Sequence, residues 1–256
     1  CYAQIGYQTA YLKAHYPSEF MAALMTAEGF DVERTAILIE ECKSLNIDVL
    51  PPDLNESFKD FTVIPTSKEP HSVRFGLGAI KNVGTNIVAA IIQSRKEGGP
   101  FKDIADFLRR VQHKDLNKKS LESLIKCGAL DSFGERGLLL NNIENMLNYS
   151  RSHQKEESRS QHGLFEEIGF ANNKLNLTPA PPADKKERLS WEKELLGLYI
   201  TDHPFKDYYE KVKTTVLPIV ELNRNLVGKI VKIGGIISQI QKEVTKNGHP
   251  MLFVEL

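Results

Sequence analysis

The residues from Arg74 to Arg95, RFGLGAIKNVGTNIVAAIIQSR, constrain the fold of this chain more than any other stretch. Three glycines, Gly76, Gly78 and Gly84, surround a polar turn, and an apolar helix follows at once. A glycine turn that opens a helix leaves the first backbone N–H groups of that helix unpaired at its positive end. That geometry suits a phosphate. The stretch therefore predicts a helical corner with an anion-binding end.

The spacing of apolar and small residues in this stretch resembles a helix-hairpin-helix motif, which holds the nucleic-acid backbone without reading bases. The predicted DNA-binding residues are Lys81, Asn82, Val83, Gly84, Thr85, Asn86, Lys118 and Lys119. The alternative is a tight helical corner that binds no ligand. A dinucleotide-binding fingerprint is not supported, because Lys81 stands where the third glycine of that fingerprint would be.

The distribution of charge favours the nucleic-acid interpretation, although the formal net charge of the chain is zero. Residues 19–60 hold 10 acids against 3 bases, whereas residues 74–126 hold 11 bases against 5 acids. A basic block centred on a glycine hairpin is the electrostatic pattern expected of a DNA-binding surface. The alternative for a charge run alone is a solvated helical surface.

Hydrophobic periodicity and capping residues predict a mainly helical fold with a small β part. Asp31 and Asn117 are placed to cap helices, and Gly128 is placed to end one. A second, diverged helix–glycine turn–helix over residues 121–143 would pair with the first in one compact unit. Helices are expected over residues 2–16, 17–29, 31–46, 104–111, 118–127 and 137–149, and short strands over 47–50, 58–64 and 72–77.

The C-terminal part changes character. Residues 150–161 contain no apolar side chain to bury and predict a flexible linker, and residues 175–184 are proline-rich. An amphipathic helix is expected over 191–209, broken at His203-Pro204. Alternating apolar residues over 226–241, a turn at Asn247-Gly248 and a returning strand over 251–256 predict a small β domain.

This β segment resembles the opening strands of an oligonucleotide-binding barrel, which binds single strands through a basic face that carries aromatic residues. The candidate single-strand contacts are Lys229, Lys232, Lys242, Lys246 and Phe253. Since only one of these residues is aromatic, base stacking is poorly supported. The sequence therefore leaves equally open whether this segment binds single strands or has lost that ability.

Several classes of chemistry are not supported by the sequence. There is no pair or cluster of carboxylates for a two-metal site, and the 7 histidines and 3 cysteines lack metal-ligand spacing. No apolar run is long enough for a membrane span, which predicts a cytoplasmic protein with no membrane partner. The start at Cys1 and the apolar final run, residues 251–256, predict a fragment of a longer chain.

A short peptide, Gln161-His162-Gly163-Leu164-Phe165, lies in the polar stretch that follows the helices. An exposed Leu-Phe pair in such a segment requires a partner pocket. The pattern is similar to the peptide by which bacterial polymerases hold the sliding clamp. The alternative is that residues 164–168 pack back on the helical unit.

Seven blocks in one order carry a family resemblance: AYLKAHYPSEFMAALMT, NIDVLPPDLNES, RFGLGAIKNVG, GPFKDIADFLRR, NKKSLESLIKCGALDSFGERG, QHGLF and EKELLGLYITDHPF. Together they resemble the C-terminal half of the bacterial replicative DNA polymerase III alpha subunits, the C-family DNA polymerases. The resemblance covers nearly the whole chain. It implies a part of a DNA-directed DNA polymerase, a nucleotidyltransferase that acts in DNA replication.

The resemblance also implies a division of the chain and a set of partners. Residues 1–70 would end the fingers domain, 71–150 would grip duplex DNA through tandem helix-hairpin-helix motifs, and 151–190 would form a linker with the clamp-binding residues Gln161, Leu164 and Phe165. Residues 191–218 would be a connector helix and 219–256 a partial oligonucleotide-binding fold. The expected partners are primer-template duplex, single-stranded DNA, the sliding clamp ring and other replicase subunits.

The catalytic carboxylates of the family match nothing in this chain, so no catalytic or metal-binding residue is predicted and the fragment alone is expected to be inactive. Mg²⁺ is expected for the parent polymerase. One rival interpretation is a standalone helix-hairpin-helix DNA-binding repair or accessory protein. Another is a helical scaffold that binds no nucleic acid.

Overall fold

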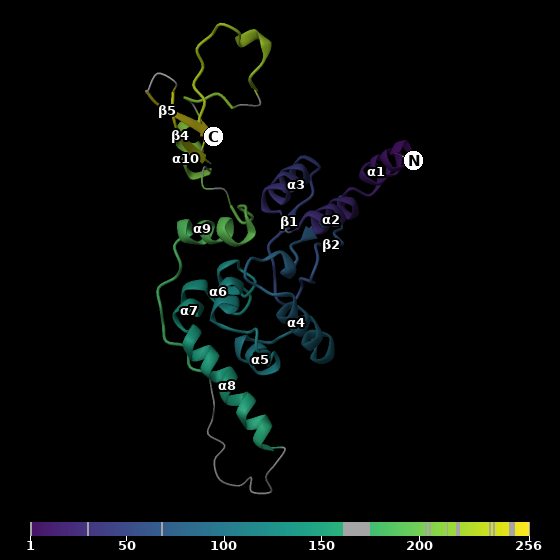
Figure 1. The fold of residues 1–256 in the computed structure, drawn as a ribbon, viewed down its shortest axis with the longest axis vertical. Coiled ribbons are helices and arrows are strands. Elements are labelled where there is room, and N and C mark those ends of the chain that lie inside the picture. The colour runs from purple at the N-terminus through teal and green to yellow at the C-terminus, as the bar shows by residue number, and fades with distance from the viewer. Residues whose placement is uncertain are drawn as a thin grey trace. The chain divides into compact units, whose positions relative to one another are not determined.

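The computed structural model describes residues 2–29, 31–67, 69–160, 175–202, 204, 206–213, 215–218, 221–235, 237, 239–245 and 249–255. The chain divides into two compact units, Cys1–Thr201 and Asp202–Leu256. Unit 1 is mainly helical and carries a three-stranded sheet, and Figure 1 traces its elements. Each unit is described by itself below.

Unit 1 opens with three helices, α1 (Tyr2–His15), α2 (Pro17–Glu28) and α3 (Val32–Ser44). Pro17 begins α2 and the Asp31 side chain accepts the Arg34 N–H, as the sequence predicts. α2 buries Met21 and Met25 completely. By contrast, α1 buries no residue, and its aromatic side chains, Tyr7 among them, stay exposed.

A small sheet separates these helices from the hairpin region. β1 (Val49–Leu50) pairs in parallel with β3 (Ser72–Arg74), and β2 (Thr62–Ile64) pairs with β3 in the antiparallel sense. All three strands are shorter than the predicted ones. Beyond β3 the chain runs against residues 58–60: a Cβ at Gly76 would lie 2.6 Å from the Lys59 carbonyl oxygen, and the Leu77 and Gly78 N–H groups donate to the Phe58 and Lys59 carbonyls.

The rest of the helical core is built from η1 (Leu77–Ala79), α4 (Thr85–Gly98), α5 (Ile104–Arg110), α6 (Lys118–Lys126), α7 (Arg136–Asn141) and α8 (Ile143–Ser160). The prediction of a single helix over 137–149 is wrong, because the chain forms two helices there, α7 and α8, which meet at Asn142. The buried Asn142 side chain donates to the Leu138 and Thr178 carbonyls and accepts the Thr178 N–H. These bonds fix the break and hold the proline-rich segment against α7.

The predicted flexible linker is also corrected at its start, because α8 continues to Ser160. Ser150 is buried and its hydroxyl donates to the Leu108 carbonyl at 3.2 Å, which ties α8 to α5. Beyond that point, glutamine, lysine and glutamate are good helix formers, so propensity extends a helix that packing has begun. The remaining linker, residues 161–174, lies outside the described residues.

Unit 1 closes with α9 (Lys185–Leu196), which begins six residues before the predicted start at Trp191. Asp184 and Glu187 form a capping box at its first turn, and Gly197 ends it in the left-handed conformation with φ of 82°. Leu195, Leu196 and Leu198 are buried in the same core as the hairpin region.

Unit 2 contains α10 (Lys206–Val212), η3 (Arg224–Leu226), β4 (Gln239–Val244) and β5 (Pro250–Glu255). β4 and β5 pair in the antiparallel sense, as predicted, and the Asn247-Gly248 turn between them lies outside the described residues. Over the described part of 226–241, strand structure begins only at Gln239. The oligonucleotide-binding barrel therefore stays a prediction.

Candidate nucleic-acid interface

The first hairpin consists of η1, the turn at residues 80–84 and α4. Gly84 is the N-cap of α4, with φ of −73° and ψ of 155°, and no side chain of the described residues caps this end. A Cβ added at Gly84 would meet no described heavy atom within 4 Å. The α4 N-terminus is thus open to solvent, and its positive end is available to an anion.

The turn itself is fixed by hydrogen bonds. The Lys81 N–H donates to the Leu195 carbonyl of α9 at 3.1 Å, and the Val83 N–H donates to the Ile80 carbonyl at 3.2 Å. Asn82 takes the left-handed conformation, with φ of 68°, and its Nδ2 donates to the Ser123 hydroxyl at 3.4 Å. The side chains of Lys81 and Asn82 are exposed.

Val83 was predicted to contact phosphate, but the structure places this residue differently. Its side chain is only 6% exposed and packs in the core, and its N–H is already donated within the turn. Thr85 and Asn86 are exposed at the first turn of α4. Asn86 Nδ2 donates to Asp115 Oδ2 at 3.2 Å, so one amide hydrogen holds the loop before α6.

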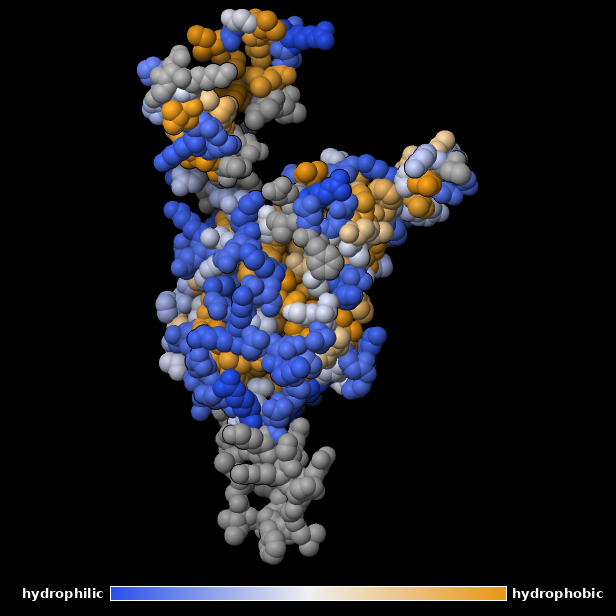
Figure 2. Space-filling view, in the orientation of Figure 1, coloured by the Kyte–Doolittle hydropathy of each residue, from blue (hydrophilic) through white to orange (hydrophobic). Residues whose placement is uncertain are grey.

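The N-terminus of α6 lies next to this turn, because Asn82 and Asn86 bond residues on either side of it. Asn117 caps this end, as the sequence predicts, and it forms a capping box with Ser120. Lys118 pairs with Glu144 at 2.8 Å, and this hydrogen bond and charge raise the pKa of Lys118 above its ordinary value. Lys119 is exposed and forms no ion pair with any described residue. Figure 2 shows one face of unit 1, on which hydrophilic side chains cover much of the surface and hydrophobic ones lie between them.

The second hairpin joins α6 to α7 and has a closed end. Glu135 is the N-cap of α7, and its carboxylate accepts the N–H groups of Leu138 at 3.1 Å and Ala183 at 2.8 Å. Burial alone would raise the pKa of Glu135, but bonds from Ala183, Leu138 and Gly137 outweigh burial and lower the pKa. The positive end of α7 therefore already holds an anion.

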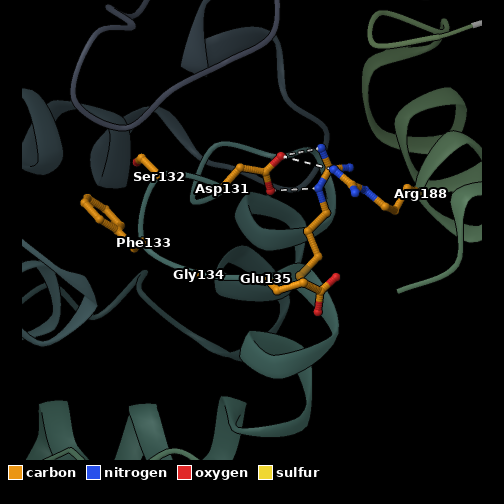
Figure 3. A pocket seen from close by; sticks show the side chains of 7 residues that line it. Asp131, Ser132, Phe133, Gly134, Glu135 and Arg188 are labelled. Atoms are coloured by element: carbon orange, nitrogen blue, oxygen red, sulfur yellow. Dashed lines mark hydrogen bonds and ion pairs between the residues drawn. The ribbon is translucent and has the colours of Figure 1, made fainter. Parts of the chain in front are cut away.

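Arg136 fills the space behind the second hairpin. Its side chain is 1% exposed, and its guanidinium donates twice to Asp131, at 2.8 and 2.7 Å. Figure 3 draws these bonds as dashed lines at the labelled Asp131. It also donates to the Lys126 carbonyl at 3.0 Å and to Glu192 at 3.3 Å. Burial lowers the pKa of Arg136, but the bonds to Asp131 and the attraction of Glu192 reverse this and leave it raised.

An open depression of about 530 Å³ lies at this second turn, lined by residues 131–136 and Arg188. Arg188 Nη2 lies 3.7 Å from Asp131 Oδ2. Two carboxylates, Asp131 and Glu135, line the depression together with Arg136 and Arg188, so its lining has no net positive charge to attract a phosphate. The geometry separates the two hairpins into one open and one occupied helix end.

The predicted clamp-binding residues, Gln161, Leu164 and Phe165, lie outside the described residues. Within the described ranges, no group of three or more His, Cys, Asp or Glu residues is arranged to hold a metal ion, and no helix is long and apolar enough to cross a membrane. Cys42 and Cys127 are buried free thiols, and burial raises the pKa of each to about 12.

Reasoning from the sequence missed the contribution of α9 to this region. Leu195 holds the first turn and Glu192 holds Arg136, although both residues lie far along the chain. The capping box at Asp184 and Glu187 was a readable signal for where α9 begins. No sequence signal identified the contacts that this helix makes.

Comparison with known proteins agrees with this geometry. The helix-hairpin-helix motif family matches residues 46–138, and the chain therefore contains a motif of this DNA-binding class. Over nearly its whole length the chain is also similar to DNA polymerase III subunit alpha. The identity is 40% over 254 residues for the protein of Thermus aquaticus, covering 98% of this chain and 20% of the relative.

Two further relatives carry the same name. The Saccharopolyspora erythraea protein is 38% identical over 269 residues, covering 100% of this chain and 22% of the relative, and the Campylobacter jejuni protein is 39% identical over 253 residues, covering 96% and 21%. The chain spans about a fifth of the length of these relatives. It is homologous to the DNA polymerase III alpha subunit and fits a fragment of it, as its motif order predicts.

Proposed function

We propose that this chain is the duplex-gripping part of a replicative DNA polymerase alpha subunit, and that the first hairpin makes the grip. The open N-terminus of α4 carries the proposal, because Gly84 leaves that end uncapped and free of obstruction within the described residues. Backbone N–H groups of Gly84, Thr85 and Asn86 would meet phosphate oxygens.

Exposed lysines would supply the sequence-independent attraction. Lys81 lies in the turn, and Lys118 and Lys119 begin the neighbouring helix α6, so the three cations flank the open helix end. Lys119 is the strongest of the α6 candidates, since Lys118 already pairs with Glu144. Val83 contributes by packing beneath the turn and Asn82 by shaping it.

The whole subunit would use this grip for processive synthesis. Template-directed addition of nucleotides with Mg²⁺ would be carried out elsewhere in the parent protein, and this chain alone would extend no primer. Gln161, Leu164 and Phe165 would tether the subunit to the sliding clamp, which raises the local concentration of enzyme at the primer end. Residues 219–256 would begin a single-strand-binding barrel.

Duplex binding against salt tests the proposal. Fluorescence anisotropy with labelled duplexes of two unrelated sequences should give equal dissociation constants that rise steeply between low and moderate salt. The double variant Lys81→Ala/Lys119→Ala should weaken both complexes and flatten the salt dependence by roughly two phosphate contacts. Binding that depends on sequence, or that the double variant leaves unchanged, would contradict the proposal.

The clamp tether needs its own measurement. Capture of the chain by an immobilised clamp ring should be lost in the variant Leu164→Ala/Phe165→Ala while duplex binding is retained. Capture that survives this change would remove the peptide from the proposal.

A further inference from the structure

Helix α9 lies outside the segment that the helix-hairpin-helix family matches, yet it contacts both hairpins. Its Leu195 carbonyl accepts the Lys81 N–H of the first turn at 3.1 Å. Its Trp191 ring lies 5.5 Å from the Lys126 ammonium at the end of α6. Its Glu192 accepts Arg136 of the second hairpin at 3.3 Å. One helix thus bridges three parts of the DNA-binding region.

Glu192 is the centre of this bridge. Its side chain is 1% exposed, and a buried carboxylate is tolerated only where charge and hydrogen bonds satisfy it. Arg136 approaches Oε1 from the hairpin side. The Ile200 and Thr201 N–H groups donate to Oε2, each at 3.2 Å, and the Thr201 hydroxyl donates to Oε1 at 2.9 Å. The carboxylate therefore fixes α9 between the second hairpin and the chain that follows α9.

The orientation of the first turn also depends on α9. Asn82 and Val83 bond within the hairpin region, but the Lys81 N–H is held only by Leu195 among the described residues. A shift of α9 would release the backbone that carries the Lys81 side chain. Because phosphate contacts need a fixed donor geometry, such a shift would reach the open end of α4.

From these contacts we infer that Glu192 is a positioning residue of the duplex grip, which holds α9 so that the Lys81 turn and the second hairpin keep a fixed spacing. The inference rests on the proposed function for its effect on DNA. It also makes a claim about the free protein, namely that the Glu192 carboxylate protects the Lys81 amide. These two parts can fail separately.

The experiment compares two variants of the full chain. Glu192→Gln removes one charge of the buried pair, and Asp106→Asn is the matched control. Asp106 is also buried and pairs with Arg109 and Arg110, but it contacts neither α9 nor the first turn. Circular dichroism first sets a temperature at which both variants remain folded.

Two readouts follow at that temperature. Exchange of the Lys81 amide hydrogen, followed by NMR, should become about tenfold faster or more in Glu192→Gln and change less than about twofold in Asp106→Asn. The dissociation constant for a random-sequence duplex should rise about fivefold or more in Glu192→Gln and less than about twofold in the control. A destabilisation without a positioning role would affect both variants alike.

Unchanged Lys81 exchange in Glu192→Gln overturns the inference, and so do equal effects in the two variants. If the unmodified chain binds no duplex, the proposed function fails, and Lys81 exchange alone then decides the positioning role. Should Glu192→Gln not fold, Thr201→Val removes one donor to Glu192 and leaves the Arg136 pair. That variant should speed Lys81 exchange about two- to threefold, and no change in it overturns the inference.

Discussion

The two hairpins follow one plan but end in opposite electrostatic states. In the first, Val83-Gly84 leads into α4, and the helix end is uncapped by any side chain of the described residues. In the second, Phe133-Gly134 leads into α7, and the Glu135 carboxylate occupies the helix end. The segment before α9 covers the same end, since the Ala183 N–H also donates to Glu135.

A glycine turn before a helix is therefore not sufficient to leave the helix end open to a phosphate. Both turns supply the backbone conformation, but only a helix end without its own carboxylate can offer its N–H groups to another anion. The first hairpin is therefore the candidate grip, and the second serves as its support through Arg136 and α9. Four pairs of substitutions test this contrast.

The largest effect on stability is expected from alanine at Gly128, compared with alanine at Gly84 in the first hairpin. Gly128→Ala should lower the free energy of unfolding by about 3 kcal/mol, because φ of 88° strains an L residue and the new Cβ would collide with the buried Arg136 guanidinium. Gly84→Ala should stay within about 0.5 kcal/mol of the unmodified chain, because its φ is ordinary and the space is open. Urea unfolding measures both, and equal losses would end the contrast.

Glu135→Gln should cost about 1 kcal/mol of unfolding free energy at pH 7, as loss of a charged cap does. The folded-state pKa of Glu135 lies below the ordinary carboxyl value, so the charged form stabilises the fold above about pH 4.3. That contribution is lost as pH falls through the lowered folded-state pKa. The difference in unfolding free energy between Glu135→Gln and the unmodified chain, measured in urea, should therefore become smaller toward pH 3.

Thr85→Ala at the matching end of α4 is the control for this prediction. It removes no carboxylate, so any change in stability that it causes should be the same at both pH values. A gap for Glu135→Gln that does not depend on pH would mean that the carboxylate does not cap α7 as an anion.

Single cations should distinguish the hairpins in DNA binding. Lys81→Ala should weaken duplex binding several-fold and reduce the salt slope by about one phosphate contact. Arg188→Ala, at the rim of the second turn, should change the dissociation constant by less than about twofold, because Arg188 already faces Asp131 at 3.7 Å and the lining there has no net positive charge. Anisotropy titrations at three salt concentrations measure the affinity of both variants. A larger loss of affinity for Arg188→Ala than for Lys81→Ala would assign the duplex contact to the second hairpin instead of the first.

The smallest effect is expected from giving the first hairpin the carboxylate of the second. Gly84→Asp should raise the free energy of unfolding by a few tenths of a kcal/mol, since aspartate is a better N-cap than glycine. The same change should weaken duplex binding, because the new carboxylate competes for the helix end. Gly84→Asn caps without charge and should weaken binding less. Stronger duplex binding by Gly84→Asp would contradict the proposed contact.

Much of the local structure could be read from the chain. Asp31 and Asn117 cap the helices they were expected to cap, and Pro17 begins α2, because these residues act through bonds to near neighbours. The break at Asn142 and the helix through Ser160 were missed. Both depend on partners far along the chain, Thr178 in one case and Leu108 in the other.

The same division holds for the candidate site. Lys81 and Gly84 were identified from the hairpin pattern, and the structure places them at an open helix end. Val83 was chosen by its place in the turn, but its burial depends on the core beneath it. The roles of Glu192 and Arg136 were invisible, since a charged residue gives no sign in sequence of being buried against another.

The glycine turns, the caps, the basic block and the similarity to the DNA polymerase III alpha subunit could be read from the sequence, because each rests on residues close together in the chain or on their order. Which helix end is free could be seen only in the folded structure. Glu135 directly precedes α7 in the chain, but Ala183 and α9 reach the hairpins only through long-range packing. An anion-binding end is made as much by the absence of an internal partner as by the residues that form it.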